Sequence, residues 1–330
     1  MQVFRSTAIV APFPRRSVSA RTLRMWCTPE VILALTNLTD EATLSPHIIN
    51  QARHSNARII LAHIQNAPAS GVREVRETLD LLARRLRWLG FTCEPVILSG
   101  RPEREIPFLV RSCGVDRVLF EFKEEADPTK KQYPPLPEQL LRALDVPVCA
   151  IGRNAVHSIR TTIRNVTLAI SSESRCEIPL SFACRLAQEF RAKLNVLHVA
   201  EEGSSDTATR DCVLARLPFS TWREAELFCP SEIVVREGQP VDGILDYCAT
   251  TQQDLIILCS SGSNRSAESW RKGVSYRTIA GARCPVFIAG DNSGRAVDVL
   301  EMTVSEEFSP RGEELTEEEE RRKSHRGAGV

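Results

Sequence analysis

The chain repeats itself along its length, and this repetition limits its fold more than any other feature. Val31–Ala34 matches Val166–Ala169, and Ala57–Ile64 matches Ala192–Val199, both at an offset of 135 residues. Further along, the offset becomes 138. At that offset Gly100–Pro102 matches Gly238–Pro240, Asp116 matches Asp254, and Pro147–Gly152 matches Pro285–Gly290. A tandem duplication explains both offsets, so one domain fold must occur twice.

The matches predict five segments. The two repeats are domains at residues 29–152 and 163–290, joined by a short polar linker at 153–162. The ends, 1–28 and 291–330, lack apolar periodicity, and we expect both to be disordered.

The N-terminal end leaves an alternative open. It contains five arginines, several serines and no acidic residue before Glu30, a composition typical of an organellar transit peptide. A disordered extension, with Met25 as a rival start of translation, is the other interpretation.

Within a repeat, short Val/Ile/Leu runs alternate with helical periodicity. In the helix predicted at Glu74–Leu89, Val75, Leu79, Leu82, Leu86 and Leu89 recur every three or four residues. This alternation is typical of βαβ units around a parallel sheet covered on both faces. The strands predicted in the first repeat are 30–36, 58–65, 93–99, 117–122 and 146–151.

The composition excludes several classes of protein. Lys+Arg and Asp+Glu are both 42, so no net charge favours nucleic acid, and no apolar run is long enough to span a membrane. The eleven cysteines include no C-x-x-C pair, which favours buried thiols in a reducing cytoplasm over disulfides or a zinc site.

Several segments together resemble the universal stress protein family (UspA domain). They are Val196–Val199, Glu237–Leu245, Asp254–Gly262 and Cys284–Gly290. The resemblance implies two Rossmann-like α/β domains of the adenine nucleotide α-hydrolase-like class, each a five-stranded parallel sheet with helices on both faces. It covers about three quarters of the chain and is stronger for the second repeat.

Some members of that family bind ATP through a loop of the form G-x2-G-x9-G-[S/T] after strand four. In the second repeat Gly262 fills the second glycine position, but the first is Cys259 and the third is Lys272, with Gly273 at the hydroxyl position. Shifting the loop by one residue places Gly273 third, followed by Val274. The residues that the resemblance implies for an ATP site, with Mg²⁺, are Ala169, Ile170, Ser171, Val199, Cys259, Ser261, Gly262, Gly273, Val274 and Ser275.

The first repeat departs further from the pattern. Its loop begins Glu121-Phe122-Lys123-Glu124 and contains no glycine, while Pro134 and Pro135 remove backbone donors. We expect no nucleotide there. The family's strand-one aspartate is also replaced, by Ser171 in the second repeat and Thr36 in the first.

No catalytic motif appears, and His63 and His198, late in strand two, are expected to be hydrogen-bonded strand residues rather than metal ligands. The sequence predicts a non-enzymatic, cytoplasmic stress-response scaffold with an unidentified protein partner. The alternative is an ATP- or AMP-binding protein that uses the Cys259–Ser275 loop. The resemblance also implies that strands 146–151 and 285–289 pair, giving an internal dimer.

Overall fold

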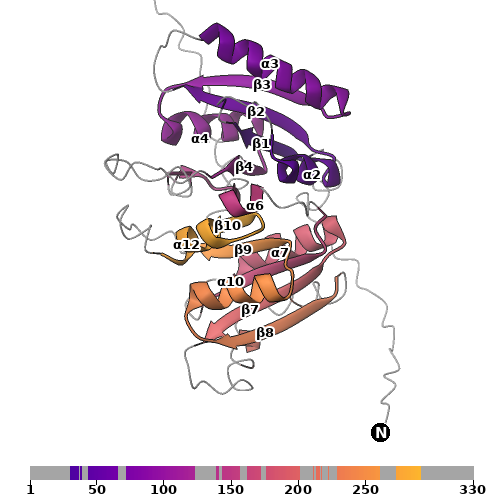
Figure 1. Cartoon of the computed structure of the whole chain (residues 1–330), viewed down its shortest axis with the longest axis vertical. Coiled ribbons are helices and arrows are strands. Elements are labelled where there is room, and N and C mark those ends of the chain that lie inside the picture. The colour runs from indigo at the N-terminus through magenta and orange to yellow at the C-terminus, as the bar shows by residue number, and fades with distance from the viewer. Residues whose placement is uncertain are drawn as a thin grey trace, which may run out of the picture. The chain divides into compact units, whose positions relative to one another are not determined.

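Figure 1 shows the computed structural model of the chain. The structure describes residues 30–36, 38, 44–65, 72–122, 139–140, 143–156, 162–171, 176–200, 211, 213–215, 217, 222, 229–260 and 273–290. The predictions for the two ends, 1–28 and 291–330, concern residues outside these ranges.

Over the described residues, ten strands form one sheet in the order β3-β2-β1-β4-β5-β10-β9-β6-β7-β8. Strands within each repeat are parallel, as runs that are apolar on both faces predict. In the first repeat they are β1 (Val31–Leu35), β2 (Arg58–Gln65), β3 (Cys93–Ser99), β4 (Arg117–Glu121) and β5 (Val148–Ile151). In the second they are β6 (Asn165–Ile170), β7 (Lys193–Ala200), β8 (Ser231–Glu237), β9 (Leu255–Ser260) and β10 (Val286–Gly290).

Helices cover both faces of this sheet. On one face lie α2 (Pro46–His54), α3 (Val72–Trp88) and α7 (Glu177–Phe190). On the other face lie α4 (Pro102–Cys113), α10 (Pro240–Thr250) and α12 (Val274–Gly281). Each face therefore has its own apolar core, and the α/β fold class predicted from the sequence is confirmed.

Helix α3, beside β3 in Figure 1, buries most of the leucines that the helical periodicity assigns to one face. Leu79, Leu82 and Leu86 are buried as predicted, since they lie on one face of the helix. Leu89 was expected on the same face, but this is wrong. The helix ends at Trp88, and Leu89 is 46% exposed in the turn that follows.

The structure corrects the predicted match of the first strands by one residue. Ile32 faces the same core as Val166, and the amide of Arg58 donates to Glu30 O just as that of Lys193 donates to Arg164 O. The offset between β1 and β6 is therefore 134 rather than 135. Because successive side chains point to opposite faces, the match read from the sequence would have placed equivalent residues on opposite faces.

The other offsets are confirmed by turns that repeat with the same backbone conformation. Asn56 and Arg191, which follow α2 and α7, both have positive φ, at 48° and 53°, and lie 135 residues apart. Gly100 and Gly238 have φ of 135° and 126° and lie 138 residues apart. Because residues with positive φ are uncommon, their occurrence at matched positions supports these offsets independently of residue identity.

The two repeats meet at β5 and β10, which pair antiparallel with Val148 opposite Ile288 and Ala150 opposite Val286. Beside this pairing the chain packs tightly. A Cβ added to Gly152 would lie 2.3 Å from the carbonyl oxygen of Ile279 in α12. Only glycine permits this close approach.

The predicted linker at 153–162 is not wholly a linker. Its first residues form the short helix α6 (Arg153–Val156), drawn near β10 in Figure 1. Ala155 is fully buried, and the side-chain amide of Asn154 donates to Ala280 O in α12 at 3.2 Å. The buried Ala155 and the hydrogen bond of Asn154 together anchor this turn.

Helix α6 also holds a buried histidine of α2. His47 is 3% exposed, and its Nε2–H donates to Ala155 O at 3.0 Å. Burial lowers the pKa of His47, and the hydrogen bond to Ala155 only partly opposes this shift. The folded chain therefore favours the neutral ring.

We predict that acidification destabilises the chain through His47. Because its folded pKa lies below the ordinary value, its contribution is complete above the unfolded pKa, roughly 6.5, and is lost as pH falls below it. Urea unfolding at pH 7.5 and 5.5 should show a smaller pH dependence for His47→Phe, since phenylalanine occupies the equivalent position 182. An unchanged pH dependence in this variant would contradict the assignment.

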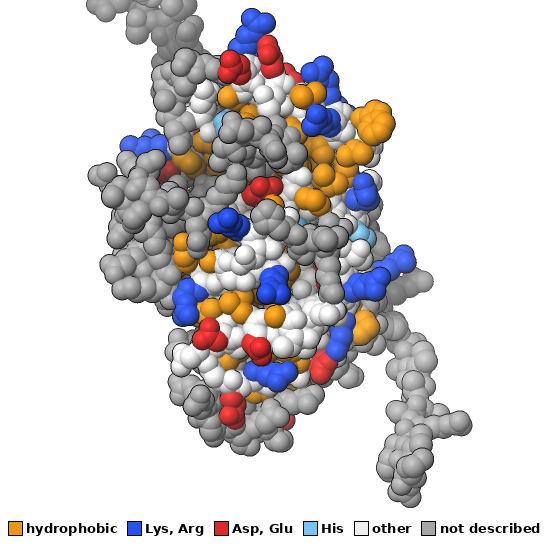
Figure 2. Space-filling model, in the orientation of Figure 1, with side chains coloured by type: hydrophobic (Ala, Val, Ile, Leu, Met, Phe, Trp, Pro, Cys, Tyr) orange, Lys and Arg blue, Asp and Glu red, His pale blue; other side chains and the backbone are white. Residues whose placement is uncertain are grey.

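The face visible in Figure 2 carries both acidic and basic side chains, scattered among hydrophobic and other residues, consistent with the balanced charge. Across the described ranges, no helix combines the length and the apolar character that crossing a membrane requires.

Candidate nucleotide site

The predicted site lies at the carboxyl edge of the second repeat. Strands β6 and β9 are adjacent and parallel, with Ala169 opposite Leu258, so both end at the same edge. Helix α12 runs back from this edge to β10, which places its N-terminus there as well. Ligands of open α/β sheets bind at such an edge, outside the carboxyl ends of the strands.

The predicted site residues divide between the two faces of the sheet. Ala169 and Val199 lie on the face covered by α10. A Cβ added to Gly243 of that helix would lie 2.8 Å from Val199 Cγ1, so α10 packs directly on Val199. Ile170 and Cys259 lie on the opposite face, toward α7.

Ser171 follows β6 directly and is exposed. The sequence paired it with Thr36 as the replacement for the strand-one aspartate. This pairing is wrong by one residue, because Thr36 O accepts from His63 and its equivalent, Ile170 O, accepts from His198. The slip follows from the offset of 134 at these strands.

The N-terminus of α12 is the best-defined part of the site. Gly273 is the N-cap residue, with φ −73° and ψ 159°, and it provides no side-chain hydrogen bond. Val274 opens the helix and is 40% exposed, and Ser275 follows it, half-buried. The first turn contains no acidic residue, so its backbone N–H groups and the helix dipole favour an anion.

The sequence did not identify an aromatic pair at this helix start. The ring of Tyr276, in the first turn of α12, meets the ring of Phe122 edge to face, with centroids 5.6 Å apart. Phe122 follows β4 of the first repeat and is buried. No local pattern could have paired these residues, which lie far apart along the chain but meet where the repeats join.

The rest of the predicted loop, including Ser261, Gly262 and Lys272, lies outside the described residues, as does the first repeat's loop beyond Phe122. The site is therefore defined by its two strand ends and its helix start.

Two histidines and two aspartates have structural roles. His63 Nδ1–H donates to Thr36 O at 3.0 Å and His198 Nδ1–H to Ile170 O at 3.1 Å, which confirms the prediction of hydrogen-bonded strand residues. At the other edge, Asp116 accepts from the amide of Val31, and Asp254 from that of Asn165. In the described part of the chain, no group of three or more His, Cys, Asp or Glu side chains could hold a metal ion.

Comparisons with known proteins agree with the α/β fold. The Universal stress protein family profile matches residues 162–290, whereas no curated protein matches the chain. A universal stress protein from Archaeoglobus fulgidus superposes with a TM-score of 0.64 at 17% identity, covering 79% of this chain and 96% of that one. A putative universal stress protein from Pseudomonas aeruginosa gives 0.56 at 13% identity, covering 84% and 99%.

A further universal stress protein from Archaeoglobus fulgidus was solved in complex with dAMP. It matches 37% of this chain and 97% of its own at 13% identity and a TM-score of 0.29. The solved structures that span most of the chain share a fold that includes both repeats. The profile match identifies residues 162–290 as a universal stress protein domain, and the first repeat adopts the same type of α/β fold.

Proposed function

We propose that the chain is a non-enzymatic universal stress protein whose two repeats form one internal pair and act as a regulatory scaffold. In this proposal neither repeat has a conventional ATP site. The second candidate function is weak nucleotide binding by the second repeat. The partner of the scaffold is a protein, because the balanced charge favours neither nucleic acid nor an anionic membrane.

The observation that carries the proposal is the start of α12. A small hydroxyl side chain at the first helical position would add a donor to the backbone N–H groups that bind a triphosphate at a helix N-terminus. Here Val274, an exposed apolar residue, fills that position, and the hydroxyl of Ser275 comes one residue later. Cys259, near the end of β9, also replaces a glycine of the family's pattern, and any side chain there limits how closely a ligand can approach the backbone.

The second candidate, nucleotide binding, is favoured by Gly273. A glycine N-cap leaves room for an anion beside the first-turn amides, and no acidic side chain opposes it there. Universal stress proteins solved with cAMP or dAMP are consistent with this second candidate. The second candidate also includes slow hydrolysis of the bound ATP.

ATP binding is therefore expected to be weak. At millimolar ATP and Mg²⁺, the Tm should rise by about 1 °C or less, the effect of a ligand near its Kd. Cys259→Gly with Val274→Ser should increase the shift, because it restores glycine space and a hydroxyl donor. Cys259→Gly with Val274→Ala is the matched control. A shift of several degrees in the unmodified chain would instead establish nucleotide binding.

Mass spectrometry of small molecules released from the purified native chain separates the two candidates independently. The scaffold proposal expects no stoichiometric nucleotide. ATP or AMP at close to one equivalent would support the second candidate.

The cytoplasm is the proposed location, and the state of the thiols supports it. Burial raises the pKa of Cys93 to about 11, and that of Cys149 and Cys248 to about 12. The buried Cys284 is shifted in the same direction. Such thiols are protonated and poorly reactive, and the cysteines of the described ranges are all free, as is usual for proteins of a reducing compartment.

A further inference from the structure

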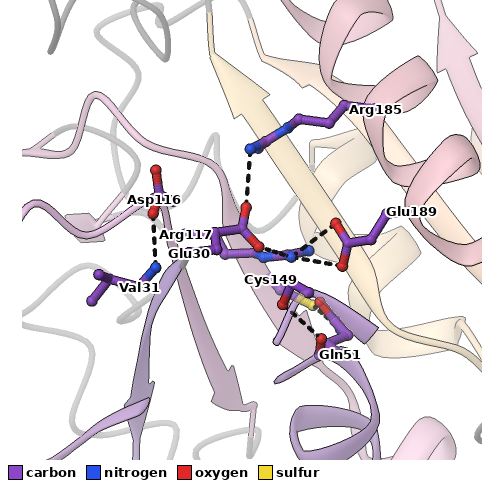
Figure 3. A network of polar contacts seen from close by, with 9 residues as sticks. Glu30, Val31, Gln51, Asp116, Arg117, Cys149, Arg185 and Glu189 are labelled. Atoms are coloured by element: carbon purple, nitrogen blue, oxygen red, sulfur yellow. Dashed lines mark hydrogen bonds and ion pairs between the residues drawn. The ribbon is translucent and has the colours of Figure 1, made fainter. Parts of the chain in front are cut away.

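The junction of the repeats contains a buried network of charges, shown in Figure 3. Arg117, the first residue of β4, is fully buried, and its Nη2 donates to Glu30 and to both carboxylate oxygens of Glu189, at 2.9 and 3.1 Å for Glu189. Arg185 Nη1 donates to the other oxygen of Glu30 at 2.9 Å. We call these four residues the junction network.

The junction network crosses from one repeat to the other. Glu30 and Arg117 belong to the first repeat, whereas Arg185 and Glu189 lie on α7 of the second (Figure 3). Each repeat supplies one acid and one base, and each acid meets a base of the other repeat. The two halves are therefore complementary.

The junction network has no counterpart at the symmetry-related position. The backbone offsets of 134, 135 and 138 residues relate its members to other side chains. Glu30 corresponds to Arg164, Arg117 to Leu255, Arg185 to Asn50 and Glu189 to His54. These residues cannot form the same network, because both acids are replaced by the basic residues Arg164 and His54, and both arginines by the uncharged Leu255 and Asn50.

The corresponding helix ends do meet, so both sides of the junction are in contact. The ring of His54, at the end of α2, lies 5.0 Å from the ring of Phe190, at the end of α7. The junction is thus symmetric in its backbone and asymmetric in its charges.

Pairing a repeat with its own copy would place the wrong side chains together. In a pair of second repeats, Glu189 would face Leu255, and Arg185 would face Arg164, a like charge. In a pair of first repeats, Arg117 would face His54 in place of Glu189. Both arrangements bury a charge with an incomplete set of partners, and each does so twice because the pair is symmetric.

We propose that the junction network selects the partner of each repeat: it admits the other repeat and excludes a second copy of the same repeat. Selectivity of this kind uses unpaired charge in the wrong complex as well as attraction in the right one. The proposal rests on the internal pairing proposed above and names the feature of the sequence that enforces it.

The test removes the tether, because a tether favours internal pairing whatever the interface contains. A protease site placed within residues 157–161 allows the folded full chain to be cut between its repeats. The cut protein is unfolded in urea, refolded by dilution and weighed by native mass spectrometry, which distinguishes the two repeats by mass. The original sequence should return pairs of unlike repeats, with like pairs at least tenfold rarer.

The matched variant makes the two sides of the junction alike by giving each network residue its counterpart. It combines Glu30→Arg, Arg117→Leu, Arg185→Asn and Glu189→His. After cutting and refolding, it should give like and unlike pairs close to their statistical shares. Statistical pairing by the original sequence, or exclusively unlike pairs in the variant, would overturn the proposal.

A second measurement uses the uncut chain and needs no refolding of separate repeats. Reversing only the first half, with Glu30→Arg and Arg117→Glu, should lower the Tm. Adding Arg185→Glu and Glu189→Arg restores complementarity and should recover at least half of the loss. No recovery would overturn the proposal, while a dimeric unmodified chain in light scattering would instead refute the internal pairing.

Discussion

Replacing Arg117 by alanine is expected to destabilise the chain by about 3–5 kcal/mol, because it leaves two acids buried without their main partner. The side chains of Glu30 and Glu189 are only 12% and 14% exposed. Burial opposes the charge of Arg117, but both acids outweigh it and raise its pKa above the ordinary value. Urea unfolding followed by circular dichroism measures this loss.

The two acids respond differently to this environment. Burial alone would raise the pKa of Glu30, but Arg117 and Arg185 outweigh burial and lower it. For Glu189 burial prevails, and its pKa is raised. The stability that Glu30 contributes is therefore present above its unfolded pKa and is lost as pH falls through its lowered folded pKa. The contribution of Glu189 is present below its unfolded pKa and is lost as pH rises through its raised folded pKa.

An exposed ion pair provides the control for Arg117. Arg73 and Glu77 on α3 lie 2.8 Å apart, with side chains 90% and 64% exposed. Arg73→Ala should change stability by about 0.5 kcal/mol or less, since exposed pairs contribute little. Equal effects of Arg73→Ala and Arg117→Ala would contradict the importance of the buried network.

Proline at Val148 is the second change with a large expected effect, because it acts on the pairing of β5 with β10. Val118 donates to Pro147 O and Phe122 to Ile151 O, so the odd-numbered residues of β5 bond β4. By alternation, the amide of Val148 faces β10. Proline removes that donor and leaves a buried acceptor unpaired, at a cost of about 1–3 kcal/mol.

The proline ring adds a further cost at this position. Val148 is 1% exposed and lies within the core on the α12 face. Forcing a different shape into a packed core costs about 1–3 kcal/mol more. Thermal unfolding should therefore show a large decrease in Tm, and light scattering should show oligomers as the two repeats separate.

Ser99→Pro at the sheet edge is the matched control for Val148→Pro. Thr92 O accepts from Ile59 and the amide of Gly100 donates to Gln65 O, so the amide of Ser99 in β3 points away from β2. The same strand already contains Pro95 in the same phase, as edge strands allow. A loss for Ser99→Pro as large as that for Val148→Pro would contradict the special role of the junction.

The strands of the fold could be predicted because their apolar runs are distinct from the helical periodicity between them. The register of β1 against β6 could not. Val31–Ala34 and Val166–Ala169 both carry apolar residues on each face, so matching letters carry no information about which face each side chain occupies. Hydrogen bonds from the neighbouring strands determine the register instead.

The junction network also could not be predicted from the sequence. Arg117 begins an apolar run and would ordinarily be assigned to an exposed strand end. Its burial depends on Glu189, which comes from a helix of the other repeat, 72 residues away.

Light scattering of the intact, full-length chain over a wide range of concentrations tests the central claim most directly. If β5 and β10 pair within one chain, as in the structure, the mass should remain near 36.8 kDa at every concentration. A mass twice that value, with cross-links joining β5 and β10 of different chains, would contradict the internal pairing.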